Sequence, residues 1–339
     1  MREPAFWWQP GSGALLSPFG GIYGIVAALR MQSKGRSAGV PVICLGNLTV
    51  GGAGKTPAAL VVGRLLLASH QRVFFLSRGY GGRLAGPVRV DPAVHSAAAV
   101  GDEPLLLARL APTIVARDRL AGAEAARRGG ASVIVMDDGF QNPALAKDLA
   151  ILLVDGRRGI GNGRVIPAGP LRAPLETQIA HAHAVVFVGP SDSAATIMKR
   201  ARRHNVAFYH ARLEPDRETI AALKGRRVLA FAGIGDPEKF FATLAEAGIT
   251  VAERASFADH HRYTATEARA LLARADADNL MLLTTEKDLV RLSGKRRLAA
   301  LAARTNPLPV QLVIEEADAF RAMILKALSQ RVAQAPTVR

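Results

Sequence analysis

One segment constrains the fold more than any other, the run Thr49-Val50-Gly51-Gly52-Ala53-Gly54-Lys55-Thr56. It follows an apolar stretch, Val40–Leu45, and opens a helical pattern at Lys55. A Gly-rich turn in this context lets backbone N–H groups surround phosphate oxygens, and the helix N-terminus adds a favourable dipole. Lys55 is predicted to reach the β- and γ-phosphates of a nucleotide, and Thr56 is predicted to ligate Mg²⁺. Thr49 stands where the usual pattern has its first glycine, so the loop entrance is expected to differ. The alternative is a Gly-rich turn with a chance Gly-Lys-Thr, against which the preceding strand argues.

Short β-branched runs alternate with helical patterns after residue 36. The expected strands are Val40–Leu45, Arg72–Leu76, Thr113–Val115, Ser132–Met136, Ala150–Val154 and Ala184–Val188. The helical patterns between them include Lys55–Leu67, Glu103–Leu110 and Leu120–Arg128. This alternation favours a doubly wound, mostly parallel α/β sheet of the P-loop NTPase kind.

A second series of elements begins near Arg227 and predicts a second, smaller α/β unit. Its expected parts are strand Val228–Phe231, helix Pro237–Ala247, apolar runs Thr250–Ala252 and Leu280–Leu283, and helix Ala317–Ala327. We expect an N-terminal arm over residues 1–36, a P-loop domain over 37–206, a connecting segment over 207–226 and a C-terminal domain over 227–339. Two further runs, Ala207–Leu213 and Val310–Ile314, are expected to pair as a small connecting ribbon.

The net charge of +16 indicates an acidic partner, which leaves nucleic acid, an anionic membrane surface and a phosphorylated substrate open. An aromatic content of only 5% and the lack of a nucleic-acid-binding signature argue against nucleic acid. A basic surface with no dedicated partner remains an alternative. The single cysteine, Cys44, excludes an intramolecular disulfide, which fits a reducing compartment; its apolar surroundings predict a buried structural thiol.

The N-terminal arm carries no charge from Pro4 to Leu29. Five glycines and two internal prolines argue against one continuous membrane-spanning helix. Ser17-Pro18 predicts a helix start near Phe19, whose apolar part would be ~16 Å long, about half the hydrocarbon core. Tryptophans precede this part and cations follow it, which suits a segment lying in a membrane interface: Trp7, Trp8, Arg30, Lys34 and Arg36. The alternative is a hydrophobic arm packed on its own domain.

Two pairs of acids are candidates for the chemistry. Asp137-Asp138 ends the apolar run Val133–Met136, so the carboxylates lie at the carboxyl edge of the sheet beside the phosphate loop. One of them is expected to hold Mg²⁺; we assign this to Asp137 and a catalytic role to Asp138. A solvated turn is the alternative. Asp102-Glu103 starts a helical pattern, and spacing alone does not separate helix capping from chemistry.

Two further motifs are weaker by themselves. Asp259-His260-His261 contains a histidine that can orient or deprotonate a hydroxyl if it meets an acid across a cleft. The loop Ser77–Arg83 combines glycines with guanidinium groups suited to phosphate oxygens. The alternatives are a surface or core histidine and a mobile basic loop.

In this order, the motifs resemble those of one family, the tetraacyldisaccharide 4′-kinases, over nearly the whole chain. The residues that carry the resemblance are Ser17–Tyr23, Gly46–Pro57, Ser77–Arg83, Gly101–Pro104, Asp137–Gln141, Gly169–Arg172, Gly233–Pro237, Asp259-His260 and Thr285–Asp288.

The resemblance implies ATP, Mg²⁺ and an anionic glycolipid acceptor, a tetraacylated glucosamine disaccharide 1-phosphate that receives phosphate at its 4′-hydroxyl. It implies two α/β/α domains with the active site in the cleft between them, at the cytoplasmic face of the inner membrane. It further implies that Asp102 and His260 form the catalytic acid–base pair and that Glu103 assists the metal. Acceptor contacts are expected from Arg78, Tyr80, Arg119, Gln141 and Arg172. No nucleic acid and no obligate protein partner are expected.

A competing function comes from another class, a membrane-associated P-loop ATPase that is switched by a protein partner. Those proteins share the Gly-Gly-x-Gly-Lys-Thr core but carry a lysine directly before the paired glycines, where this chain has Val50. A nucleic-acid-binding ATPase is the third possibility and rests on charge alone. ATP turnover with and without acceptor lipid separates the three.

Overall fold

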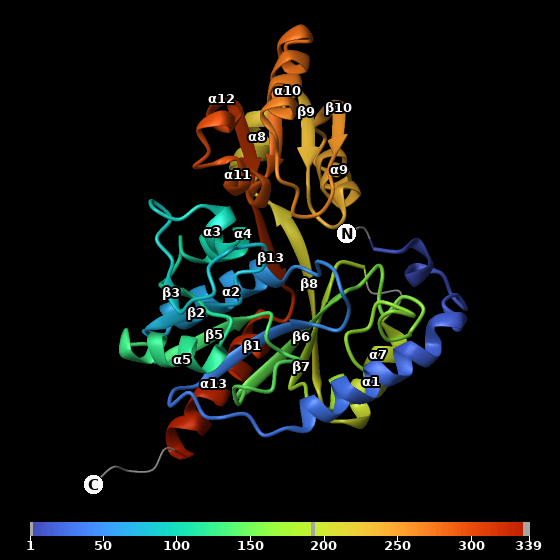
Figure 1. Ribbon diagram of the computed structural model, residues 1–339, viewed down its shortest axis with the longest axis vertical. Helices are drawn as coiled ribbons and strands as arrows, with labels where there is room; N and C mark the ends of the chain where they lie inside the picture. The colour runs from blue at the N-terminus through green and yellow to red at the C-terminus, as the bar shows by residue number, and fades with distance from the viewer. Residues whose placement is uncertain (1–2, 191–193, 335–339) are drawn as a thin grey trace.

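The computed structural model describes residues 3–190 and 194–334, which form two sheets flanked by helices (Figure 1). The first two residues of the expected arm and the last five of the expected C-terminal domain lie outside the described residues.

The larger sheet has nine strands in the order β13-β8-β7-β6-β1-β5-β2-β4-β3. Neighbouring strands are parallel except at the two edges, where β13 is antiparallel to β8 and β3 to β4. The strands are β1 Val42–Asn47, β2 Val73–Ser77, β3 Val88–Arg89, β4 Thr113–Val115, β5 Val133–Asp137, β6 Leu149–Asp155, β7 Ala184–Val188, β8 Ala207–Pro215 and β13 Val310–Ile314. The expected doubly wound, mostly parallel α/β sheet is confirmed.

Helices cover both faces of this sheet, which explains why β1, β5 and β6 are apolar at nearly every position. Along β1, Val42 and Cys44 contact the core on one face, and Ile43 and Leu45 contact the core on the other. The first core is completed by α5 Arg119–Arg128, α6 Leu175–Ala180 and α7 Ala195–Arg203, and the second by α2 Lys55–Ala68 and α13 Ala317–Gln334. Burial raises the pKa of the Cys44 thiol to about 12, as expected of a structural cysteine.

The smaller sheet has four parallel strands in the order β10-β9-β11-β12. These are β9 Arg227–Ala232, β10 Thr250–Ser256, β11 Met281–Thr285 and β12 Thr305–Leu308. Its helices are α8 Arg217–Leu223, α9 Pro237–Glu246, α10 Ala265–Ala277, α11 Glu286–Leu292 and α12 Ala299–Arg304, with a 3₁₀ turn η3 at Arg296–Leu298. Apolar clusters lie on both faces of this sheet as well.

The connecting runs pair as expected, with Ala211 opposite Ile314 and Pro215 opposite Val310. They are not a separate ribbon, because β8 also pairs with β7 and so extends the large sheet. The last strand and helix of the chain therefore return to the large sheet, although the expected division placed them in the C-terminal domain. The reason is apolar burial: side chains of β13 and α13 complete the core beside α2, among them Leu312, Ile314 and Phe320.

The N-terminal arm contains η1 Ala5–Trp8, η2 Ala14–Leu16 and the helix α1 Ser17–Gln32, which lies along the outside of the large sheet (Figure 1). A Cβ on Gly20 would strike the carbonyl of Val165, so α1 packs through its glycines. Exposed apolar side chains lie on η2 and along most of α1: Leu15, Phe19, Ile22, Ile25, Val26 and Leu29. Residues Ala14–Gln32 are long and apolar enough to cross a membrane by length and composition alone, and only 17% of this stretch is buried.

Candidate active site

The phosphate loop connects the end of β1 to the start of α2. Gly54 adopts a left-handed conformation (φ 82°) directly before Lys55, the first residue of the helix. The Asn47 side chain donates to the carbonyl of Gly51 (2.7 Å), and the amide of Val50 donates to Pro170 (2.8 Å). These two bonds brace the loop at Val50 and Gly51, and the amides from Gly52 to Lys55 are the ones expected to surround phosphates. Thr49, at the unusual first position, is buried and accepts a hydrogen bond from Arg172 through its carbonyl (3.1 Å).

Asp137 ends β5 and lies beside the phosphate loop, because β5 pairs directly with β1. Its carboxylate is fully buried, and neither oxygen has a hydrogen-bond partner among the described residues; the hydroxyl of Thr56 is in the same condition. Burial, with the negative charge of Glu103 second, raises the pKa of Asp137 to about 7. Unpartnered buried oxygens are costly unless a ligand completes them.

These oxygens fit a Mg²⁺ site that is completed by nucleotide phosphates. Mg²⁺ in such enzymes is held by one or two carboxylates together with phosphate oxygens and water. In the described part of the chain, no three His, Cys, Asp or Glu side chains form a metal site by themselves. The oxygens of Asp137 and Thr56 would therefore complete a Mg²⁺ site only together with the phosphates of a bound nucleotide.

Asp138 faces cations from two directions and has a left-handed backbone (φ 56°). Its carboxylate accepts from Arg172 (2.8 Å) and lies 3.9 Å from the Lys55 ammonium. Burial alone would raise its pKa, but Lys55 and Arg172 hold the pKa of Asp138 below its ordinary value. Asp138 is therefore ionised and keeps Lys55 at the loop.

Asp102, the first residue of α4 Asp102–Leu107, lies next to His260 of the smaller unit, where the two units meet. His260 Nδ1 lies 3.4 Å from Asp102 Oδ2, and Arg291 Nε donates to the same oxygen (2.7 Å). Burial would raise the pKa of Asp102, but the hydrogen bond from His260 and the charge of Arg291 hold it well below its usual range. The same hydrogen bond raises the pKa of His260. The structure thus brings the predicted acid and histidine together.

His260 Nδ1 also lies 3.4 Å from the Arg291 guanidinium. A guanidinium only donates, and the Asp102 carboxylate only accepts. Because the hydrogen bond with Asp102 is the main cause that raises the pKa of His260, we assign the Nδ1 proton to that bond. The other ring nitrogen, Nε2, faces outward towards Asp259 at 3.8 Å.

Glu103 is bound by Lys287 (2.7 Å), and the positive charges of Lys287 and Lys55 lower its pKa against the effect of burial. The Glu103 carboxylate thus binds a lysine of the smaller unit, while its negative charge also acts on Asp137 of the expected metal site. Asp288 braces the same region by accepting from the amide of Gly233 (3.0 Å) and from Tyr263 (2.9 Å).

Sequence reasoning missed Lys287 and Arg291, which belong to α11. Lys287 belongs to the motif Thr285–Asp288, which supports the family resemblance but does not by itself indicate a role for this lysine. Positions four apart share a face of a helix, so the spacing from Lys287 to Arg291 was the available signal.

The predicted acceptor contacts fall into two groups. Arg78 and Tyr80 are exposed, and the Tyr80 ring lies 5.0 Å from that of His260. Arg119 is buried under Asp138, where it donates to the carbonyls of Ala116 (2.6 Å) and Asp138 (3.3 Å). The Gln141 amide donates to Asn47 and Gln178 (2.9 Å each), beneath the loop. Arg119 and Gln141 remain predictions as acceptor contacts, and the structure gives them bonds within the protein.

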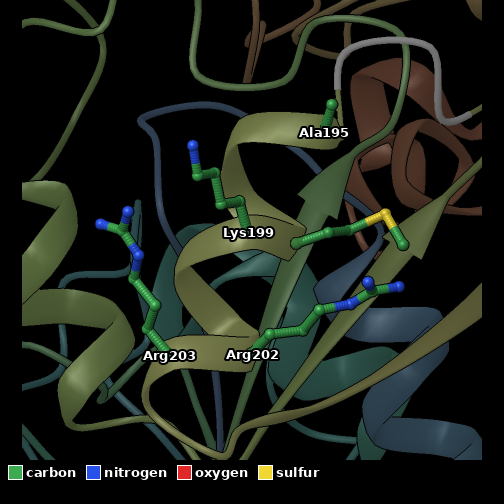
Figure 2. A pocket seen from close by; sticks show the side chains of 5 residues that line it. Ala195, Lys199, Arg202 and Arg203 are labelled. Carbon is green, nitrogen blue, oxygen red and sulfur yellow. The ribbon is translucent and has the colours of Figure 1, made fainter.

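A basic hollow lies on the opposite face of the large sheet from α2. It is formed by α7 and lined by Ala195, Met198, Lys199, Arg202 and Arg203 (Figure 2). The Arg202 guanidinium lies over the ring of Phe208, 5.6 Å from its centroid. None of the described residues that line this hollow is acidic.

Comparison with known proteins agrees with this geometry. Residues 12–329 match the family model described as tetraacyldisaccharide-1-P 4′-kinase. Tetraacyldisaccharide 4′-kinases of Rhodopseudomonas palustris (strain BisB18) and Nitrobacter winogradskyi are 53% and 50% identical over 332 residues, with at least 97% of each chain covered. The solved structure of LpxK from Aquifex aeolicus in complex with ATP superposes with a TM-score of 0.73 at 28% identity, covering 93% of this chain and 99% of that one. The chain belongs to the tetraacyldisaccharide-1-P 4′-kinase family.

Proposed function

We propose that this chain transfers the γ-phosphate of ATP to the 4′-hydroxyl of a tetraacylated glucosamine disaccharide 1-phosphate, a step in lipid A biosynthesis. The observation that carries the proposal is the buried Asp102–His260 contact across the cleft, beside a phosphate loop whose Lys55, Thr56 and Asp137 are preorganised. Family membership supports the kinase activity and the class of acceptor.

The loop from Thr49 to Thr56 would hold the nucleotide, with backbone amides and Lys55 on the phosphates. Asp137 and Thr56 would hold Mg²⁺ directly or through water, and Glu103 would join them on release from Lys287. When bound, Mg²⁺ neutralises charge on the β- and γ-phosphate oxygens. The buried, unpartnered oxygens of Asp137 and Thr56 would then be satisfied.

In the transfer, the 4′-oxygen forms a bond to the γ-phosphorus while the bond from phosphorus to the bridging oxygen breaks, and ADP leaves with that oxygen. The hydroxyl proton passes to the Asp102–His260 pair. The transition state of such transfers is loose, so the proton leaves late and a weakly basic group suffices. Arg291 fixes the carboxylate, and the hydrogen bond that Nδ1 donates to Asp102 orients the His260 ring so that Nε2 is left for the acceptor hydroxyl.

Asp138 would serve catalysis by holding Lys55 and Arg172 in place. Arg78, Tyr80 and Arg172 are the proposed acceptor-facing groups: Tyr80 lies beside His260, Arg172 binds Thr49 at the loop entrance, and Arg78 belongs to the same exposed segment as Tyr80. Arg119 and Gln141 are proposed to act at the same site through Asp138 and the loop.

We further infer that the enzyme works as a peripheral protein at the cytoplasmic face of the inner membrane. The exposed apolar side chains of η2 and α1 support contact with lipid; Leu15 of η2 is 94% exposed and Ile22 of α1 is 65% exposed. The net charge of +16 and the basic hollow on α7 support an anionic surface.

The test is ATP turnover by the purified protein with and without the tetraacyldisaccharide 1-phosphate, with the product analysed by mass spectrometry. We expect turnover to require the lipid and to yield a lipid with one additional phosphate, at the 4′ position. Lipid-independent turnover with no phosphorylated lipid would favour the partner-switched ATPase instead.

A further inference from the structure

An acid from the N-terminal arm lies on the phosphate loop. Glu3 precedes η1, yet its carboxylate reaches Gly51, where an added Cβ would collide with Glu3 Oε1. The Gly51 backbone is in a conformation that favours glycine (φ 107°). A negative charge therefore lies against a loop whose amides are arranged to receive anions.

Arg158 holds this carboxylate in place. One guanidinium nitrogen donates to Glu3 Oε2 (2.9 Å) and another to Asp236 of the smaller unit (2.8 Å). The Trp8 ring lies beneath the guanidinium, 4.8 Å from centroid to Cζ, and the Trp8 side chain also hydrogen-bonds Glu3. Arg158 follows β6, whose carboxyl end lies at the same sheet edge as the loop.

Apart from Arg158 and Trp8, the surroundings of Glu3 disfavour a negative charge. Glu3 is largely buried and also feels the negative charges of Asp259 and Asp236. Nucleotide phosphates would meet the same carboxylate at Gly51, and like charges repel strongly where water is excluded. Phosphates would also compete for the guanidinium, since Arg binds phosphate and carboxylate with the same fork geometry.

We propose that Glu3 competes with nucleotide phosphates for the phosphate loop and for Arg158, so that ATP binding requires the start of the arm to leave the loop. The proposal rests on the proposed nucleotide-binding role of the loop. In this proposal Glu3 inhibits ATP binding, and Arg158 is a positioning residue that binds the Glu3 carboxylate before ATP binds and a nucleotide phosphate afterwards. ATP binding at the phosphate loop and displacement of Glu3 from that loop would then always occur together.

The arm carries its own reporter, because Trp7 and Trp8 are the only tryptophans of the chain. Trp7 is buried and donates to Pro167, whereas Trp8 packs on Arg158. In a Trp7→Phe variant, ATP titration followed by calorimetry and by Trp8 emission should give the same dissociation constant. ATP binding by calorimetry with no change in Trp8 emission would overturn the proposal.

The charge itself is tested by Glu3→Gln and Glu3→Ala. Each should bind ATP about fivefold more tightly than wild type, corresponding to about 1 kcal/mol. The matched control is Glu246→Gln, which removes the same charge from an exposed site at the end of α9 and should leave the ATP dissociation constant unchanged.

Each outcome has a separate meaning. Equal or weaker ATP binding by both Glu3 variants, in protein with a wild-type melting temperature, refutes the role of Glu3. An equal gain in Glu246→Gln refutes it too, since general charge would then be the cause. Absence of ATP binding in wild type and in all variants would instead refute the proposed function.

Discussion

Replacement of Arg291 by methionine is the most discriminating perturbation of the cleft. Arg291 is 5% exposed and donates to Asp102 (2.7 Å), to Asp288 (3.0 Å) and to the carbonyl of Gly233. Methionine replaces the apolar stem of arginine, but it lacks the guanidinium and donates nothing. The variant therefore removes the guanidinium charge from two buried carboxylates and one donor from a carbonyl, although Asp102 keeps His260 and Asp288 keeps Gly233 and Tyr263.

The expected cost follows from that burial. Removing one partner of a buried ion pair costs roughly 3–5 kcal/mol, because the remaining charge is desolvated and uncompensated. A domain is stabilised by only about 5–15 kcal/mol in total, so the loss is large. The matched control is Arg304→Met, which breaks an ion pair with Asp276 whose side chains are 48% and 60% exposed. Exposed pairs of this kind contribute about 0–1 kcal/mol.

Urea unfolding followed by far-UV circular dichroism measures both variants under the same conditions. We expect Arg291→Met to lose at least ~2 kcal/mol more than Arg304→Met. Adding Asp102→Asn to Arg291→Met should recover part of the loss, because a neutral amide is cheaper to bury than an unpaired carboxylate. Equal losses in Arg291→Met and Arg304→Met would refute the claim that Arg291 neutralises buried charge.

Four further predictions concern the proposed roles. Lys55→Ala should abolish transfer with little loss of stability; retention of more than about a tenth of kcat/KM, ~1.4 kcal/mol, contradicts a phosphate contact. Asp102→Ala and His260→Ala should each depress kcat strongly, and the double variant should lose less than the product of the two, whereas multiplicative losses would mean independent action. The folded state raises the pKa of His260, so the protonated imidazole stabilises the fold fully below about pH 6.5, and this contribution is lost as pH rises through the raised pKa. His260→Gln should remove this pH-dependent contribution from the urea unfolding midpoint measured as a function of pH. An unchanged pH profile in the variant would contradict the assignment to His260. Deleting residues 1–29 should raise the KM for lipid and reduce sedimentation with anionic vesicles, with high salt releasing only part of the full-length protein; a well-folded truncation that binds vesicles as before would exclude the arm as an anchor.

Much of the large sheet was predictable because its signals are local. A fully buried parallel strand must be apolar at nearly every position, and a phosphate loop needs its glycines and its Lys-Thr in sequence. The predicted strands before residue 190 therefore lie within two residues of the observed ones. The short edge strand β3 was missed, because two residues are too few to show the alternation of apolar and polar residues that marks a strand.

The chain ends were less predictable. An apolar strand followed by an amphipathic helix is locally the same whether it joins the small sheet or the large one. Only the unfilled core beside α2 decides that β13 and α13 return to the large sheet. In the same way, exposed apolar residues on α1 are evident only once its neighbours are placed.

The amino-acid sequence by itself determined the fold class, the phosphate loop and the family, because each of these depends on residues that are close together in the chain. It also named Asp102 and His260, although only through resemblance. The tertiary structure alone decided which charges meet: Arg291 with Asp102, Lys287 with Glu103, and Glu3 with Arg158. These partners are 155 to 189 positions apart. Their pairing depends on two units closing on one cleft, and no local pattern encodes that geometry.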